Sequence, residues 1–246
     1  ALPILRLMFK NLIKSVIPES VLQKRRRRIA EREQNKFAEK SVSETFSEIY
    51  EKNVWGGAAG EFYSGEGSNE KYAVRYAETV KKFIAENDIK KVVDLGCGDF
   101  RVASQFVSDE FHYIGCDVVP NLIEHLNKIY GNENVEFYCR NIVEDELPDG
   151  DLCLIRQVLQ HLSNSEIKRI LENVKKYKYL IVTEQYPNQK KQIVPNLDIP
   201  HGPDVRLHFD SAVFLNEQPF NLPNVKQLLD VEADEGTRIK TFIIER

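Results

Sequence analysis

The sequence lacks the features that mark several protein classes. No uninterrupted apolar run approaches the roughly 18 residues of a membrane-spanning helix, because Arg6, Lys10 and Lys14 interrupt the first apolar segment. The same three charges argue against a secretory signal, whose apolar region carries none. The four cysteines show no C-x-x-C spacing, so neither a zinc site nor a disulfide framework is indicated. We therefore expect a protein of the reducing cytoplasm.

Basic residues are scarce outside the first part of the chain. Residues 1–40 carry 11 Lys and Arg against 4 Asp and Glu, whereas the other 206 residues carry 23 against 34. Because a surface that binds nucleic acid must neutralise phosphates, we expect no nucleic-acid partner for residues 41–246. With 42% hydrophobic and 29% charged residues, the 246-residue chain has the composition of one large globular domain with an extension.

The basic extension, residues 1–40, is predicted to be helical. Apolar residues recur every three or four positions over residues 1–17 with basic residues between them, which is typical of an amphipathic helix. Pro18 ends this helix, and a second one follows that contains the basic run 24–28. Two interpretations are open: the extension packs on the rest of the protein, or residues 1–28 bind the anionic inner face of a membrane as a peripheral attachment.

The rest of the chain alternates between short apolar segments and helical patterns. Strands are predicted at residues 91–95, 112–117, 135–139, 152–155 and 179–183, and helices at residues 70–87, 100–107, 119–130 and 163–176. This alternation predicts an α/β protein with a doubly wound, mostly parallel sheet. The last two strand-like runs, 225–233 and 239–245, are joined by a turn too short for a crossover helix. They must form an antiparallel hairpin, which completes a seven-stranded sheet.

A glycine-rich turn follows the first predicted strand. The run Asp94-Leu-Gly96-Cys97-Gly98 places two glycines at the end of a parallel strand, where such folds bind ligands and where a ligand must approach the backbone closely. A nicotinamide-dinucleotide fingerprint needs a third glycine where this chain has Arg101. Asp94 instead puts a carboxylate where a cationic ligand group can lie.

Together with the residues after it, this turn resembles the first motif of the class I S-adenosylmethionine-dependent methyltransferases, and the resemblance covers about residues 70–246. It implies that the cofactor is S-adenosylmethionine, that the fold is Rossmann-like and that Asp117 accepts hydrogen bonds from both ribose hydroxyls. Asn141 stands where the family usually has Asp beside the adenine amino group, and its amide oxygen can accept the same bond. The cofactor-binding residues implied in this way are Asp94, Gly96, Cys97, Gly98, Asp117, Val118, Asn141, Ile142, Arg156 and Gln157.

Two segments without regular periodicity are expected to form the acceptor site. Residues 41–69 are rich in glycine and aromatic residues, are expected to form a loop that covers the active site, and carry WGG and SGxGS patterns that resemble bacterial methyltransferases acting on surface sugars. The 187–224 connection is long and turn-rich, and such segments in compact domains are usually functional. The alternative for this connection is a solvated loop. The residues predicted to contact the acceptor are Trp55, Ser64, Asp204 and Arg206, with Arg206 binding an anion.

Methyl transfer is an in-line displacement, so the protein mainly supplies positioning and, for a hydroxyl acceptor, a base. The candidate bases near the ends of the fourth and fifth strands and in the 187–224 connection are His161, Glu184 and His201. A base that titrates near neutrality favours histidine, although His161 in an amphipathic segment is also typical of a structural hydrogen-bonding residue. Acidic and histidine residues show no metal-ligand spacing near the strand ends, so we predict a metal-independent reaction.

The predicted function is O-methylation of a sugar or glycan intermediate. Aromatic side chains together with Asp, Asn and His suit polyhydroxyl ligands, and a basic extension suits a lipid-linked acceptor at a membrane. One alternative is a methyltransferase that acts on a hydroxyl or carboxylate of another small metabolite. Another is a non-catalytic adenosylmethionine-binding module or a membrane-tethered scaffold. The sequence carries no signal of the oligomeric state.

Overall fold

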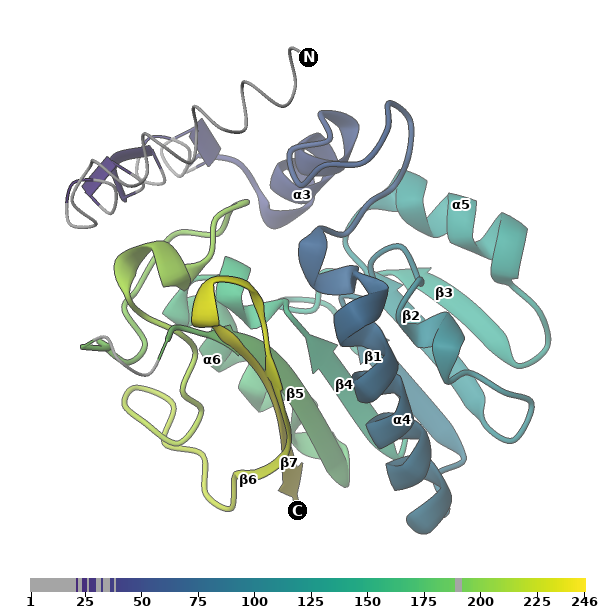
Figure 1. Cartoon of the computed structure of the whole chain (residues 1–246). Coiled ribbons are helices and arrows are strands. Elements are labelled where there is room, and N and C mark those ends of the chain that lie inside the picture. Colours follow the sequence, from purple (N-terminus) through teal and green to yellow (C-terminus); the bar gives the residue numbers. More distant parts are fainter. Residues whose placement is uncertain are drawn as a thin grey trace, which may run out of the picture.

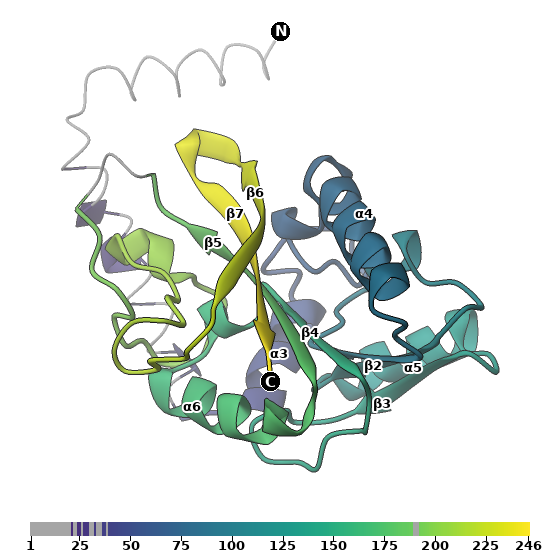
Figure 2. The same cartoon turned by 90° about the horizontal axis from the view of Figure 1, so that it is seen from below.

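A computed structural model describes residues 39–188 and 192–246, with scattered positions between residues 21 and 37. These residues form one sheet with helices on both of its faces (Figures 1 and 2). The predicted helix of residues 1–17 lies outside the described part, whereas the described positions between 21 and 37 are helical. In the described part of the chain, no helix is long and apolar enough to cross a bilayer.

The sheet of the described residues has seven strands in the order β3-β2-β1-β4-β5-β7-β6. They are β1 (Lys91–Leu95), β2 (His112–Asp117), β3 (Val135–Cys139), β4 (Leu152–Arg156), β5 (Tyr179–Tyr186), β6 (Lys226–Glu232) and β7 (Arg238–Glu245). Strands β1 to β5 are parallel, and β7 is antiparallel to both β5 and β6. The predicted mostly parallel sheet and its terminal antiparallel hairpin are therefore confirmed. The central strands β1 and β4 are apolar along most of their length because both of their faces are buried.

Helices cover the two faces of this sheet. The described α-helices are α3 (Val42–Glu51), α4 (Glu70–Glu86), α5 (Pro120–Tyr130) and α6 (Asn164–Asn173). Helix α4 covers one face and α6 the opposite face, while α5 packs beside β2 and β3 (Figures 1 and 2). Short 3₁₀ turns lie between these elements: η1 (Glu66–Ser68), η2 (Ala103–Gln105), η3 (Leu159–His161), η4 (Val174–Lys176), η5 (Arg206–Phe209) and η6 (Asp234–Gly236).

Helix α3 occupies the first part of the segment that was predicted to be a loop, residues 41–69. A capping box starts the helix, and its buried residues recur at three- and four-residue spacing. The helix lies over the edge of the sheet where the parallel strands end (Figure 1). The hydroxyl of Ser43 donates to the carbonyl oxygen of Val118, just after β2, over 3.0 Å. The prediction of a loop is thus wrong for this helix, which covers the edge of the sheet predicted to bind the cofactor.

The helix predicted for residues 100–107 is also wrong, because turns and the short η2 occupy this segment. Phe100 has a φ of +64°, in the left-handed region that cannot continue a right-handed helix. Its buried ring packs 5.3 Å from the ring centre of Tyr113 and 5.1 Å from that of Phe137. The left-handed backbone at Phe100 thus accompanies the burial of its ring among other aromatic side chains.

The 187–224 connection is irregular apart from η5, but side chains hold its described residues together. The Asn196 amide donates to the carbonyl oxygens of Phe214 (2.9 Å) and Gln218 (2.8 Å), and its oxygen accepts from the Phe214 backbone over 2.7 Å. Tyr186 at the end of β5 donates to the carbonyl oxygen of Val213 over 2.6 Å. Such bonds take the place of regular secondary structure in satisfying the backbone.

The described end of the basic extension contacts the rest of the protein. Phe37 is only 4% exposed, and the guanidinium of Arg27 lies 5.5 Å from the ring centre of Phe209 in the 187–224 connection. Val21 and Ile29 are about half exposed, at 52% and 51%. This part of the extension packs on the protein through one side and leaves other apolar and basic side chains at the surface.

Candidate active site

A cavity lies at the carboxyl ends of β1, β2, β3 and β4, under helix α3. Its empty volume is about 1010 Å³, part of which is open to solvent. The cavity is lined by all ten residues that the resemblance implies: Asp94, Gly96, Cys97, Gly98, Asp117, Val118, Asn141, Ile142, Arg156 and Gln157. Because parallel strands all end at the same edge, residues up to 63 positions apart meet here.

The glycine-rich turn has a backbone that other residues would strain. Gly96 and Gly98 have φ values of +78° and +57°. A Cβ atom on Gly96 would lie 2.3 Å from Val158 Cγ2, and one on Gly98 would lie 2.4 Å from Ser64 Oγ. The Gly98 amide donates to Asp117 Oδ2 over 3.1 Å, which joins the turn to the end of β2.

Two buried carboxyl groups line the cavity beside this turn. Asp94 Oδ2 accepts from the Tyr113 hydroxyl over 2.8 Å, and Asp117 Oδ1 accepts from the Val119 amide over 3.2 Å. Burial raises the pKa of Asp94 and of Asp117 to about 6, because a charged carboxylate is poorly solvated there. Each oxygen can still accept a further bond, so the site suits a ligand that brings hydroxyl donors and positive charge.

The end of β4 contributes donors on another side of the cavity. Arg156 Nη2 donates to the Gly67 carbonyl oxygen over 2.6 Å, and its guanidinium lies 5.1 Å from the Tyr76 ring centre. Among the described residues, Arg156 Nε and Gln157 Nε2 are buried without a hydrogen-bond partner. Gln157 also has a strained φ of +55°. Unpaired buried donors on a strained backbone indicate a place for an acceptor group of a ligand.

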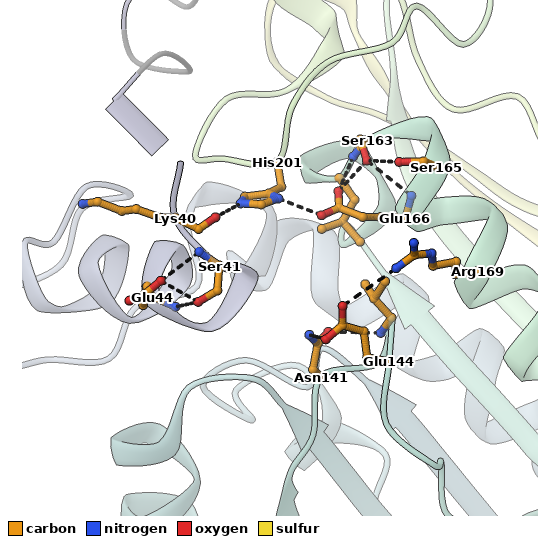
Figure 3. A network of polar contacts seen from close by, with 12 residues as sticks. Lys40, Ser41, Glu44, Asn141, Glu144, Ser163, Ser165, Glu166, Arg169 and His201 are labelled. Atoms are coloured by element: carbon orange, nitrogen blue, oxygen red, sulfur yellow. Dashed lines mark hydrogen bonds and ion pairs between the residues drawn. The ribbon is translucent and has the colours of Figure 1, made fainter. Parts of the chain in front are cut away.

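The side chain of Asn141, which was predicted to lie beside the adenine, is held in one orientation (Figure 3). Its side-chain oxygen accepts from the Val143 amide over 3.1 Å, and its Nδ2 lies 3.4 Å from a carboxylate oxygen of Glu144. Arg169 of α6 lies 3.8 Å from the other oxygen of Glu144. The side-chain oxygen of Asn141 therefore already accepts one hydrogen bond, and it can accept a second one from another donor.

An aromatic wall forms the outer part of the cavity. Trp55 lies 5.1 Å from the ring centre of His161 and 5.9 Å from that of Phe46, and its Nε1 donates to the Pro203 carbonyl oxygen over 3.0 Å. The segment after α3 thus meets the 187–224 connection. Phe46 and Tyr50 of α3 also line the cavity and were not predicted. Their helical spacing after a capping box was visible in the sequence, but the place where the helix packs was not.

Ser64, predicted to contact the acceptor, lines the cavity but is engaged by protein atoms. Its hydroxyl oxygen accepts from the Asp99 amide over 2.8 Å and lies 2.8 Å from the Tyr50 hydroxyl oxygen. Its own amide donates to an Asp99 carboxylate oxygen over 3.0 Å. Ser64 thereby joins the segment after α3 to the glycine-rich turn.

His161 lines the cavity as a neutral imidazole. Its Nδ1 lies 3.3 Å from the Asp204 carbonyl oxygen, which can only accept, so Nδ1 carries the hydrogen. Nε2 is then the basic nitrogen, and its nearest polar neighbour is the Gln160 side-chain amide at 3.4 Å. Burial lowers the pKa of His161 to about 4. The expected titration near neutrality is therefore wrong for this residue.

His201 lies outside the cavity lining, contrary to its prediction as a base. Figure 3 shows its ring between Lys40 and Glu166. Its Nδ1 lies 2.7 Å from a Glu166 carboxylate oxygen, and its Nε2 lies 3.0 Å from the Lys40 carbonyl oxygen. Both partners are acceptors, so both nitrogens donate, and the Glu166 bond raises the pKa of His201. Neither nitrogen is left to take a proton from a substrate. His201 instead links Glu166 of α6 to Lys40, which lies two residues before α3.

Three other predicted residues have structural roles. The prediction that Arg206 binds an anion is wrong, because its side chain is 1% exposed and donates to protein oxygens. Asp204 contacts His161 through its backbone carbonyl oxygen, and its side chain does not line the cavity. Both oxygens of Glu184, which is also 1% exposed, accept backbone amides, so Glu184 is not placed as a base. Among the described residues, no group of three or more His, Cys, Asp or Glu is placed to hold a metal ion.

We predict that Glu184 makes the protein less stable as the pH rises. Burial raises its pKa to about 8, above the ordinary 4.5, so the folded state holds a proton that the unfolded chain has lost. The free energy of unfolding should therefore fall by roughly 1 kcal/mol between pH 7 and pH 8 on account of this group. Urea titrations should show a smaller fall in Glu184→Gln.

His201 also contributes to the loss of stability as the pH rises. Its pKa is raised in the folded protein, so the stability that its bound proton gives is lost at higher pH. Part of the fall should therefore remain in Glu184→Gln. The control is Glu172→Gln, whose side chain is 67% exposed and which should keep the full fall. Equal pH dependence in wild type and Glu184→Gln would contradict this account of the buried carboxyl group.

The comparisons with known proteins agree with this arrangement. Residues 92–177, about a third of the chain, match the family model described as a methyltransferase domain. A search of curated protein sequences finds no significant match. Among solved structures, the methyltransferase domain of bacterial CtHen1 aligns with 71% of this chain and 98% of its own, at 17% identity and a TM-score of 0.50.

Two further structures illustrate the range of these relatives. The [4+2]-cyclase SpnF aligns over 82% of this chain and 96% of its own, at 15% identity and a TM-score of 0.50. The N-methyltransferase NodS from Bradyrhizobium japonicum WM9, in complex with S-adenosyl-L-homocysteine, aligns over 71% and 88%, at 10% identity and a TM-score of 0.49. At these identities the likeness concerns the fold, and a shared fold does not specify the acceptor.

Proposed function

Residues 92–177 match a methyltransferase domain, and we propose that the chain is a class I, S-adenosylmethionine-dependent enzyme that methylates a hydroxyl group of a sugar or glycan intermediate. The observation that carries this proposal is His161, a neutral imidazole with its basic Nε2 in a cavity walled by Trp55. A neutral base beside an aromatic face suits a neutral hydroxyl acceptor. Sugar rings present apolar C–H faces that pack well on such aromatic walls.

The residues of the cavity fit S-adenosylmethionine. Asp117 would hold the ribose hydroxyls and Asp94 the positively charged part, since both are buried acceptors. Arg156 Nε and Gln157 Nε2 are the unpaired donors that would bind its carboxylate. Ile142 would pack on the adenine. When bound, S-adenosylmethionine supplies an electrophilic methyl group on a sulfonium.

The chain itself contributes position and a proton acceptor. His161 Nε2 would take the proton that the acceptor hydroxyl loses on methylation, and the Asp204 carbonyl oxygen holds Nδ1–H so that Nε2 stays free of hydrogen. Phe46, Tyr50 and Trp55 line this end of the cavity with apolar surface. The alternative of a carboxylate acceptor loses support, because Arg206, the cation predicted to bind it, is bonded to protein oxygens.

The acceptor proposal is tested with S-adenosylmethionine that carries a ¹³C-labelled methyl group. Purified enzyme is incubated with nucleotide sugars or with extracted glycolipids, and the products are separated and examined by NMR. We expect label in O–CH₃ signals of a sugar, and much less label with Asp117→Ala when S-adenosylmethionine is near the wild-type Kd. Label in N–CH₃ or methyl-ester signals, or only in acceptors without sugar, would show that the acceptor is of another class.

We further propose that the basic extension binds anionic membranes. Exposed Lys24, Arg25 and Arg28 lie on the described part of the extension together with the half-exposed Val21 and Ile29. Basic residues near an anionic surface each contribute up to about 1 kcal/mol of attraction, and apolar side chains insert beside them.

The triple variant Lys24→Gln, Arg25→Gln, Arg28→Gln should therefore bind anionic vesicles about tenfold more weakly at low salt. Co-sedimentation with vesicles rich in phosphatidylserine measures this. A matched control neutralises three basic residues of α4, Arg75, Lys81 and Lys82, which are all exposed. If both triple variants lose the same vesicle affinity, the effect comes from net charge and not from the extension. If neither loses affinity, the extension packs on the rest of the protein and does not bind membranes.

A further inference from the structure

The turn that carries His161 has few hydrogen bonds of its own. It is the 3₁₀ turn η3, Leu159–His161, just after β4. Within it and at its ends, the His161 amide donates to the Val158 carbonyl oxygen over 3.0 Å and the Leu162 amide to that of Leu159 over 3.1 Å. A single 3₁₀ turn has poor hydrogen-bond geometry and little stability alone. Contacts from other elements must therefore define its position.

Glu184 of β5 binds the amide side of this turn. Its Oε1 accepts from the Leu159 amide over 2.9 Å, and its Oε2 accepts from the Gln160 amide over 3.2 Å. These amides are among the groups that a short turn leaves without partners. One carboxyl group thus satisfies two successive amides and orients the start of η3 relative to the sheet.

Arg206 of the 187–224 connection binds the carbonyl side of the same turn. Its Nη1 donates to the Leu159 carbonyl oxygen over 2.9 Å, and its Nη2 donates to that of Leu162 over 2.7 Å. The remaining bonds of the guanidinium, to the Leu197 carbonyl oxygen and Asn164 Oδ1, are each 3.0 Å and hold Arg206 itself. A planar guanidinium with five fixed donors is suited to such a task.

The same connection also binds His161 directly. The Gly202 amide donates to the His161 carbonyl oxygen over 3.0 Å, and the Asp204 carbonyl oxygen accepts from Nδ1. Gly202, Asp204 and Arg206 lie within five residues, so one short stretch determines both the turn and the ring. The 187–224 connection therefore contacts both η3 and the His161 ring through these three residues.

Burying Glu184 and Arg206 is unfavourable for the fold alone. Both side chains are 1% exposed, and an ionisable group loses its hydration when it is buried. What the pair adds is a defined position for the three residues of η3.

We propose that Glu184 and Arg206 are positioning residues, which hold η3 from its amide and carbonyl sides and so set the place and the tautomer of His161. This inference rests on the proposed function, in which His161 Nε2 accepts the proton of the acceptor hydroxyl. Neither residue touches the substrate or the cofactor in this account, because neither lines the cavity.

The test uses Glu184→Gln and Arg206→Lys in the full chain. Gln keeps the size of Glu but turns an NH₂ group toward one of the two amides, and Lys keeps the charge but cannot reach two carbonyl oxygens with a fixed fork. We expect kcat to fall about tenfold in each, while the KM for the acceptor and the affinity for S-adenosylmethionine stay within about threefold. Thr241→Val is the control, since it removes the buried 2.9 Å contact between the Thr241 and Thr183 hydroxyls in the same sheet without touching η3.

A second readout does not depend on turnover. In ¹⁵N NMR of the imidazole, wild-type His161 should show a single tautomer with hydrogen on Nδ1, and both positioning variants should show a mixture. Thr241→Val should match the wild type. An unchanged tautomer together with unchanged kcat in Glu184→Gln and Arg206→Lys would overturn the proposal, and so would equal losses of kcat in Thr241→Val.

The two proposals fail in different ways. If His161→Ala is fully active, the proposed base is wrong, and the NMR readout alone then decides whether Glu184 and Arg206 position the ring. If His161→Ala is inactive but the tautomer and kcat are unaffected in both positioning variants, the base stands and the positioning role is overturned. Thermal unfolding of each variant identifies a loss of kcat that comes from unfolded protein.

Discussion

His161→Ala is expected to lower turnover by at least about 10²-fold, the usual effect of losing a general base. Binding of S-adenosylmethionine should stay within about threefold, because the ten residues that fit the cofactor come from the glycine-rich turn and the ends of β2, β3 and β4. Single-turnover methyl transfer and calorimetry measure the two quantities separately. His112→Ala is the matched control, since His112 starts β2 at the opposite end from the cavity.

The pH dependence of kcat/KM gives an independent check on His161. Because burial lowers its pKa to about 4, the imidazole stays unprotonated and able to accept a proton throughout the neutral range. The acid limb caused by this group should therefore lie near pH 4 and not near 6.5. Full activity of His161→Ala, or an acid limb near 6.5 that survives in it, would show that another group or positioning alone supports the transfer.

Asp117→Ala is expected to weaken S-adenosylmethionine binding by about 1.5–3 kcal/mol, roughly 10- to 150-fold, the range for hydrogen bonds to a charged group. The carboxylate is the ribose acceptor in the proposed site, and it also binds the Gly98 and Val119 amides, so the substitution loosens the glycine-rich turn as well. Calorimetry with S-adenosylmethionine and S-adenosylhomocysteine measures the change. Asp149→Ala, whose side chain is 91% exposed, should bind as the wild type does.

The affinity should also depend on pH in a defined direction. Asp117 has a pKa of about 6 in the ligand-free protein, so below this pH it binds a proton and becomes a weaker acceptor. Wild-type affinity should fall as the pH drops below 6, and the fall should be smaller in Asp117→Asn. No binding of S-adenosylmethionine by the wild type, or tighter binding of a nicotinamide dinucleotide, would refute the assignment of the cavity.

The sequence by itself determined the sheet and which residues gather at its carboxyl edge, where we propose that the cofactor binds. Strands β1 to β5 are short apolar runs between turn-forming residues, and such runs are local properties of a chain. Because parallel strands deliver their carboxyl ends to one edge, the residues after each strand meet without any further information. Asp94, Gly98, Asp117 and Asn141 could be placed together for this reason.

Only the tertiary structure decided the acceptor side. Helix α3 had a readable capping box, but its position over the cavity depends on distant contacts such as that of Ser43 with Val118. His201 and Arg206 had the residue types of a site, yet the former bonds Glu166 and Lys40 and the latter bonds four protein oxygens. A side chain shows in the sequence what it can donate or accept. Which partner a side chain of the 187–224 connection contacts depends on the conformation of this irregular segment, and no local periodicity in the sequence encodes that conformation.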